Sequence, residues 1–311
     1  MGGLDIMEIK FLSRDELVEN IDKFCELSAA RFTAKINEDI VRHRFLENPY
    51  EDLILCVAID DGKLVSTFGA MPSVMMIDNK PYKTGIFVNV MTLPEYEGKG
   101  LIVTLMKKVC EKMKEDGYAF GYSFPNYASN PIFCAKLDGI DIYEIPTLQL
   151  KIDPEFEVEP VSVMSTDDWS NLKEESTDSI HVLKEEKYIT WRYKNHRTND
   201  YKIVKFSDDV WCIYNIYQKE INITEYHYAG NPDNLRLIIN YLYNVAKEKN
   251  LEKITTWCKL NTKAHLMFER CGFLNSAPIR YFNIVNLTYD GKTDITDSRN
   301  WNIFMGDDNV Y

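Results

Sequence analysis

The spacing of apolar residues changes repeatedly along the chain, and each change predicts a different element. Ser13-Arg14-Asp15-Glu16 has the pattern of a helix capping box, and apolar residues at helical spacing follow it as far as Leu27. A second, short helix is expected over residues 37–45. The pattern therefore predicts two helices near the start of the chain.

From residue 53 the apolar period falls to two, which is the spacing of half-buried strands. Asp60-Asp61-Gly62 and Asp78-Asn79-Lys80 are turn sequences, and Asp-Gly tolerates the positive φ of a tight hairpin. Pro94 ends the strand region because proline has no N–H to donate to a sheet. We therefore predict an antiparallel meander with strands over residues 53–59, 63–71, 74–77 and 82–93.

Beyond Pro94 the helical period returns and stops near Gly117. The apolar stripe of this helix consists of Leu101, Leu105, Met106, Val109, Cys110 and Met113. A strand, a short helix and a closing strand are expected next, over residues 120–124, 130–137 and 147–152. The segment 153–168, with two prolines and several acids, is typical of a partly extended linker.

The second half of the sequence echoes the first. Arg44 and Arg192 each lie nine residues before a predicted strand, at Leu53 and Tyr201. Later in each half an asparagine stands seven residues before a phenylalanine, as Asn126 and Phe133 and then as Asn261 and Phe268. Matches in the same order predict an internal duplication. We place the two copies at residues 1–152 and 153–311.

Composition narrows the possible functions. A chain of 311 residues has room for two domains, and its 48 acidic against 36 basic residues give a net charge of −12. That charge argues against nucleic acid or an anionic membrane as a partner. The longest apolar runs are too short to span a membrane, and Met1-Gly2-Gly3-Leu4 does not begin a secretory signal. The seven cysteines form no CxxC pair, so we expect reduced thiols, no metal site and a cytoplasmic protein.

The most informative segment is the strand, glycine turn and helix start from Val88 to Leu101. Such a turn directs unpaired backbone N–H groups at one point, where the helix N-terminus also carries partial positive charge. Gly98 and Gly100 let the main chain approach a bulky anion without a Cβ in the way. A strand-to-helix turn that needs glycine for geometry alone is the other interpretation of these two residues.

In its context this segment resembles the GNAT superfamily of acyl-coenzyme A transferases. The resemblance implies an α/β (α+β) fold of two GNAT-like domains, each a mixed, largely antiparallel twisted sheet flanked by helices. It also implies that acetyl-CoA or another acyl-CoA is the co-substrate, with its pyrophosphate on the turn Gly98, Lys99, Gly100, Leu101 and Ile102. The family has Arg or Gln where Glu97 stands and a small residue where Ile102 stands. We expect Glu97 to point away from the phosphates or to be offset by Lys99.

The resemblance assigns the pantetheine arm to the strand before the turn, at Val90, Met91 and Thr92. A second strand, Tyr122-Ser123-Phe124, is expected to splay from it, followed by Asn126 and a helix that carries Phe133. Asn126 bonds the pantetheine amides in this interpretation, or it caps the next helix. The family's tyrosine acid is missing, because the matching position holds Cys134, which we interpret as a packed thiol rather than a nucleophile.

For the chemistry itself we predict that Asn89 holds the acceptor and that Ser123 or Tyr122 assists the departing thiolate. Strand alternation would place Phe87, Asn89 and Met91 on one face and Val88, Val90 and Thr92 on the other. Glu95 or a water chain is the candidate base. We expect the main catalytic effects to be positioning and polarisation of the thioester carbonyl by the Met91 N–H.

The second copy lacks the glycine turn, since Ala229-Gly230-Asn231-Pro232 contains no G-x-G and Pro232 has no amide to donate. We expect it to brace the first copy or to contact the acceptor. The predicted function is N-acylation of a small-molecule amine by a monomer or homodimer. The resemblance to bacterial surface-sugar N-acyltransferases points to an amino sugar or nucleotide-linked amino sugar as the acceptor. A Fem-like aminoacyl transferase and a catalytically degenerate acyl-CoA-binding or scaffold protein are the alternatives.

Overall fold

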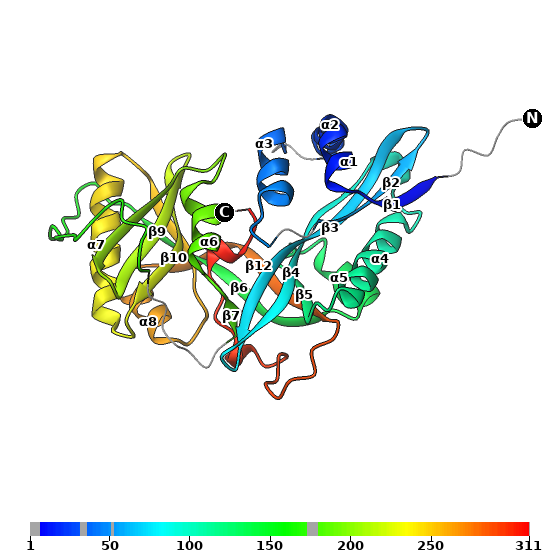
Figure 1. Ribbon diagram of the computed structural model, residues 1–311. Helices are drawn as coiled ribbons and strands as arrows, with labels where there is room; N and C mark the ends of the chain where they lie inside the picture. Colours follow the sequence, from blue (N-terminus) through cyan, green and yellow to red (C-terminus); the bar gives the residue numbers. More distant parts are fainter. Residues whose placement is uncertain (1–6, 32–35, 51–52, 173–179, 311) are drawn as a thin grey trace, which may run out of the picture. The chain divides into compact units, whose positions relative to one another are not determined.

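The computed structural model describes residues 7–31, 36–50, 53–172 and 180–310, which fall into two units (Figure 1). The first unit contains Met1–Met76, Lys80–Ile142 and Phe282–Thr296, and the second contains Ile77–Asn79, Tyr143–Tyr281 and Asp297–Tyr311. The mixed α/β architecture with largely antiparallel sheets agrees with the predicted fold class. The boundary at residues 152/153 stays a prediction, and the contacts divide the chain at Ile142/Tyr143.

The first helix begins at the predicted capping box, but the single helix expected as far as Leu27 is divided at Asn20 into two. Strand β1 (Glu8–Phe11), which the apolar pattern did not predict, precedes α1 (Arg14–Glu19) and α2 (Ile21–Arg31). The Ser13 side chain accepts the N–H of Glu16, and the Glu16 carboxylate accepts the N–H of Ser13, which completes the predicted capping box. Next, α3 (Glu38–Val41) runs directly into the π-helix η1 (Arg42–Leu46).

The meander has two long strands where the sequence predicted three shorter ones. Strand β2 (Ile54–Asp60) pairs with β3 (Lys63–Ile77), and β4 (Lys80–Thr92) follows after a tight turn. The expected break between residues 71 and 74 is wrong, because β3 continues through Pro72. The Pro72 carbonyl accepts a hydrogen bond from Asn48 Nδ2 at 3.0 Å, so a side chain supports the strand at this point.

After the short 3-10 helix η2 (Pro94–Tyr96) come α4 (Leu101–Glu115), β5 (Phe120–Ser123), α5 (Asn130–Leu137) and β6 (Ile140–Lys151). The predicted stripe of α4 is buried at Leu101, Leu105, Met106, Val109 and Met113, and Cys110 is half-buried. The sheet of the first unit has the order β1-β2-β3-β4-β5-β12, in which β4 and β5 pair in parallel and the pairs β1–β2, β2–β3 and β5–β12 are antiparallel.

The second unit repeats this order of elements. Its strand β7 (His181–Val182) precedes α6 (Glu186–Ile189), which again runs into a π-helix, η3 (Thr190–Lys194). The elements that follow are β8 (Tyr201–Ser207), β9 (Val210–Tyr217), β10 (Glu220–Tyr228), α7 (Pro232–Glu248), β11 (Lys253–Trp257), α8 (Lys263–Arg270) and β12 (Leu274–Asn286). The short 3-10 helices η4 (Ser298–Asn300) and η5 (Met305–Asp307) end the chain. This repetition supports the predicted duplication.

The last strand of each copy is not where its position in the sequence suggests. β5 pairs antiparallel with the end of β12, from Asn283 to Asn286, whereas β6 pairs antiparallel with β11. Each unit therefore includes a strand from the sequence of the other copy. For this reason the division by contacts assigns Phe282–Thr296 to the first unit.

Candidate active site

The glycine turn at the start of α4 has the geometry of an open cradle. Gly98 and Gly100 have φ values of 73° and 75°, in the left-handed region that L side chains rarely adopt. A Cβ built on either residue meets no atom within 4 Å. The first hydrogen bond inside the helix joins Thr104 N to Gly100 O at 3.1 Å. The backbone N–H groups before Thr104 therefore have no carbonyl partner within the helix. Backbone geometry requires glycine at both positions, and open space faces both.

Glu97, the acidic residue in this turn, is paired with a residue the sequence did not suggest. Its Oε1 lies 2.8 Å from Nη2 of Arg31, at the end of α2. Lys99, expected to offset Glu97, instead places its ammonium 4.8 Å from the centroid of the Tyr96 ring. The Arg31 pair is half-exposed and contributes at most about 1 kcal/mol, but it neutralises the carboxylate beside the cradle.

Strands β4 and β5 are paired in parallel over only three residues each, and their separation toward the turn stays a prediction. Their parallel pairing covers Thr84–Ile86 with Phe120–Tyr122 and stops there. Beyond it Phe87 lies against Gly121, where a Cβ would come within 2.1 Å of the ring. Phe87 also stacks on Phe133 of α5, with ring centroids 5.8 Å apart. Phe133 is therefore part of an aromatic cluster where the pairing of β4 and β5 ends.

A left-handed residue interrupts β4 at Asn89, whose φ is 58°. The alternation predicted across this point is therefore wrong, because a residue with positive φ breaks the two-residue period of a strand. The Asn89 Oδ1 accepts from Nη1 of Arg44 at 3.5 Å, and the buried Nδ2 has no hydrogen-bond partner among the described residues. Asn89 thus keeps one donor without a partner beyond the end of the β4–β5 pairing.

The three residues after Asn89 differ in the burial and hydrogen bonding of their side chains. Val90 is half-buried and Met91 is buried. Ser66 Oγ donates to the Met91 carbonyl at 2.9 Å and lies 2.8 Å from Thr92 Oγ1, which therefore donates to it. The side chain of Thr92 bonds its neighbouring strand, so only its backbone remains for a ligand.

Ser123 begins a buried chain of polar groups. Its hydroxyl donates to Asn283 Oδ1 at 2.5 Å, Asn283 Nδ2 donates to Asn130 Oδ1 at 2.9 Å, and Asn130 Nδ2 donates to Asp141 at 3.0 Å. Ser123 and Asn283 are 160 positions apart, so no local pattern could have revealed this network. Tyr122, the other candidate acid, is 2% exposed and packs edge-on against Phe282.

Asn126 adopts the capping geometry that was one of its two interpretations. Its Oδ1 accepts the N–H groups of Ala128 and Ser129 at 3.0 and 3.1 Å, ahead of α5. The side chain is exposed, which leaves the second interpretation open. Burial, with Asp141 nearby, raises the pKa of the Cys134 thiol, which disfavours the thiolate that a nucleophile needs.

Residues 16–134 match the family model of an acetyltransferase (GNAT) domain. They contain the cradle, strands β4 and β5 and both adjoining helices. This segment is a GNAT acetyltransferase domain.

A curated relative of the GNAT domain is a Bacillus subtilis protein named as a ribosomal protein bS18-alanine N-acetyltransferase. It is 32% identical over 109 residues, which are 35% of this chain and 66% of the relative. The chain therefore spans slightly less than two thirds of that protein.

Solved structures resemble the chain well beyond the matched segment. A probable N-acyltransferase from Enterococcus faecalis has a TM-score of 0.65 at 16% identity, covering 91% of this chain and 73% of that one. A GCN5-related N-acetyltransferase from Kribbella flavida has a TM-score of 0.65 at 12% identity, covering 91% and 72%. At these identities the likeness establishes the fold alone.

No group of three or more His, Cys, Asp or Glu side chains suited to a metal occurs in the described ranges. Across those same ranges, no helix is long and apolar enough to cross a membrane.

Proposed function

We propose that the GNAT domain transfers an acetyl group from acetyl-CoA to the primary amine of a small acceptor. The observation that carries this proposal is the pair of left-handed glycines, Gly98 and Gly100, with open space on the side where a Cβ would be. A diphosphate fits there because helix N-terminal amides donate to it and the dipole favours its charge. The pairing of Glu97 with Arg31 removes the main electrostatic objection to such a ligand.

Beyond their pairing, strands β4 and β5 would hold the arm that links the diphosphate to the thioester. We assign backbone contacts with that arm to Val90, Met91 and Thr92, and polarisation of the thioester carbonyl to the Met91 N–H. The bound co-substrate supplies an activated acyl group with a thiolate as its leaving group. Because a thiol has a pKa of about 8.5, the thiolate leaves at neutral pH without a strong acid. The transfer therefore does not depend on Ser123, whose hydroxyl donates to Asn283, or on the buried Tyr122.

Asn89 would orient the acceptor. Its unpartnered Nδ2 suits an oxygen of the acceptor, while Arg44 holds Oδ1. An amide takes up no proton, so the amine must lose its proton to water or to another side chain. Glu95 is a poor choice for that base, because its own backbone N–H and the ammonium of Lys63, 3.1 Å away, lower its pKa.

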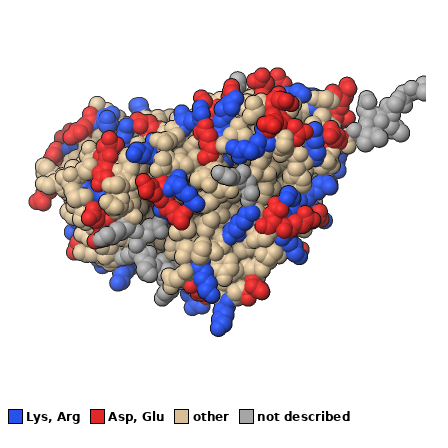
Figure 2. All heavy atoms as spheres, in the orientation of Figure 1, with Lys and Arg blue, Asp and Glu red and all other residues tan. Residues whose placement is uncertain are grey.

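Two acceptor classes follow from different observations. The resemblance to surface-sugar acyltransferases favours an amino sugar, whereas the name of the Bacillus relative favours the N-terminal amine of a polypeptide. The Fem-like alternative would need a surface for aminoacyl-tRNA. With a net charge of −12, and with Lys and Arg interspersed among Asp and Glu on the face in Figure 2, such a surface has little support.

The deciding experiment is release of coenzyme A thiol, measured with the full chain, acetyl-CoA and matched amines. The panel contains glucosamine, a nucleotide-linked amino sugar, and a short peptide that begins with alanine. Turnover with a sugar supports the first acceptor class, and turnover with the peptide alone supports the second. Binding of acetyl-CoA without any thiol release would support the degenerate-binding alternative. The absence of both would overturn the proposal.

A further inference from the structure

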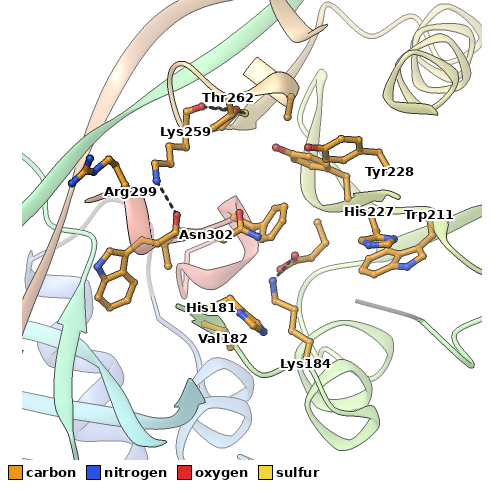
Figure 3. A pocket seen from close by; sticks show the side chains of 17 residues that line it. His181, Val182, Lys184, Trp211, His227, Tyr228, Lys259, Thr262, Arg299 and Asn302 are labelled. Atoms are coloured by element: carbon orange, nitrogen blue, oxygen red, sulfur yellow. Dashed lines mark hydrogen bonds and ion pairs between the residues drawn. The ribbon is translucent and has the colours of Figure 1, made fainter. Parts of the chain in front are cut away.

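The second unit contains a cavity of about 290 Å³ where β10 and β11 separate. Their parallel pairing ends at Ile223 and Thr256, and the cavity is lined by residues 225–228 of β10 and by Cys258 and Lys259, which follow the end of β11. The C-terminal segment from Arg299 to Phe304 and the segment from His181 to Lys184 close it (Figure 3). The cavity therefore lies at the position in the second copy that corresponds to the end of the β4–β5 pairing in the first.

A buried ion pair in this cavity is already compensated. Lys184 Nζ lies 2.6 Å from Glu225 Oε2 and 3.3 Å from Asp307 Oδ1, and the Tyr193 hydroxyl donates to Glu225 Oε1 at 2.6 Å. The Lys184 and Glu225 side chains are 5% and 1% exposed. Burial raises the pKa of Glu225 above its usual range, so this carboxyl is a weak anchor for a cationic ligand.

Lys259 is different, because its ammonium donates to carbonyl groups and no described carboxylate lies within ion-pair distance of it; the Asp297 carboxylate, which attracts it from farther away, is paired with Arg299 at 2.6 Å. Nζ donates to the Ser298 carbonyl at 2.5 Å and to the Trp301 carbonyl at 3.3 Å, which leaves one N–H. Within the described part of the chain no carboxylate forms an ion pair with it. Burial lowers the pKa of this half-buried lysine, Asp297 offsets part of that effect, and a bound anion would offset more of it.

The opposite wall of the cavity is aromatic. Figure 3 shows Lys259 and Arg299 on one side and Trp211, His227 and Tyr228 on the other. The Trp211 and His227 rings stack with centroids 5.9 Å apart. His227 Nδ1 lies 2.7 Å from the Asp209 carbonyl and must carry the proton, which makes the buried Nε2 an acceptor without a partner among the described residues.

We propose that this cavity binds a small organic carboxylate with a planar apolar body, with its carboxylate on Lys259. The planar body would lie against the aromatic wall. This site lies within the second unit and is additional to the acetyltransferase function proposed for the first. Its ligand need not contain a phosphate, because the turn from Ala229 to Pro232 has no cradle.

The test uses three probes of one shape that differ in charge: indole-3-acetate, tryptophol and tryptamine. Isothermal titration calorimetry on the full chain should show indole-3-acetate binding at least tenfold more tightly than the neutral and cationic analogues. Lys259→Met should remove this preference and Lys259→Arg should retain part of it. Lys219→Met, a change at an exposed lysine outside the cavity, is the matched control and should bind like wild type.

Three results with the wild-type protein would overturn the proposal: equal affinity for the three probes, a preference for tryptamine, or no binding at all. These measurements need no variant, so they hold even if a variant fails to fold. Undiminished binding in Lys259→Met would do the same. Acetyl-CoA binding is measured in parallel. A protein that binds indole-3-acetate but no acetyl-CoA would retain this site and refute the proposed transferase.

Discussion

Gly100 and Gly117 stand at opposite ends of α4 and form a natural pair for testing the cradle. Their φ values are 75° and 76°, and a Cβ built on either meets nothing within 4 Å. Replacing either glycine with tryptophan forces an L residue into the left-handed backbone conformation, which should lower the free energy of unfolding by roughly 1–2 kcal/mol. Only Gly100→Trp puts an indole beside the N-terminal amides of the helix.

The magnitudes make the two effects separable. A loss of 1–2 kcal/mol lowers the melting temperature by roughly 2–8 °C at about 2–4 °C per kcal/mol for large domains. A ligand at about 100 times its dissociation constant stabilises by roughly 2.7 kcal/mol, which is a rise of roughly 5–11 °C. Both variants should therefore melt lower than wild type, but acetyl-CoA should raise the melting temperature of Gly117→Trp and not of Gly100→Trp.

The assay is thermal unfolding of wild type and both variants, with and without acetyl-CoA. A ligand-induced rise in Gly100→Trp as large as in Gly117→Trp would refute the assignment of the cradle. No rise in any of the three proteins would refute acetyl-CoA binding altogether. A rise lost in both variants would indicate that strain in α4, rather than blocked access, controls binding.

Three further predictions concern individual residues. Asn89→Gly keeps the left-handed backbone, so stability should change by less than about 1 kcal/mol while kcat/KM for the amine falls roughly tenfold or more; unchanged kinetics would contradict the acceptor role. Gly121→Ala forces a Cβ against Phe87 and should cost about 1–3 kcal/mol in urea unfolding, and adding Phe87→Leu should recover part of it. The Ser13 N–H and Lys10 lower the pKa of Glu16 from 4.5 to about 2, so Glu16 stabilises the fold above its unfolded pKa and loses that effect as the pH falls toward 2. The difference in urea midpoint between wild type and Glu16→Gln should therefore shrink as the pH falls from about 4.5 to about 2, and a constant difference would contradict the assignment.

Features that depend on local sequence could be predicted from the residues alone. The capping box at Ser13, the buried stripe of α4 and the turn at Gly98 and Gly100 all follow from spacing within one or two helical turns. The helix cap that Asn231 forms for α7 has the same origin, since its Oδ1 accepts the N–H of Asp233 two residues later. Glycine is required at the cradle because of its backbone φ, which is why the cradle could be found from the sequence.

Features that join distant segments were decided by the tertiary structure. Nothing near Asn89 in the sequence indicates a left-handed residue inside β4, since Asn is compatible with an ordinary strand as well. The bond from Ser123 to Asn283, the pairing of Arg31 with Glu97, and the exchange of final strands each need contacts across many residues. That the Lys259 ammonium donates to the carbonyl groups of Ser298 and Trp301 depends on contacts with the C-terminal segment, which its neighbours in the sequence do not reveal. Periodicity reports which face of an element is buried, but the partner that buries it is determined by packing of the whole chain.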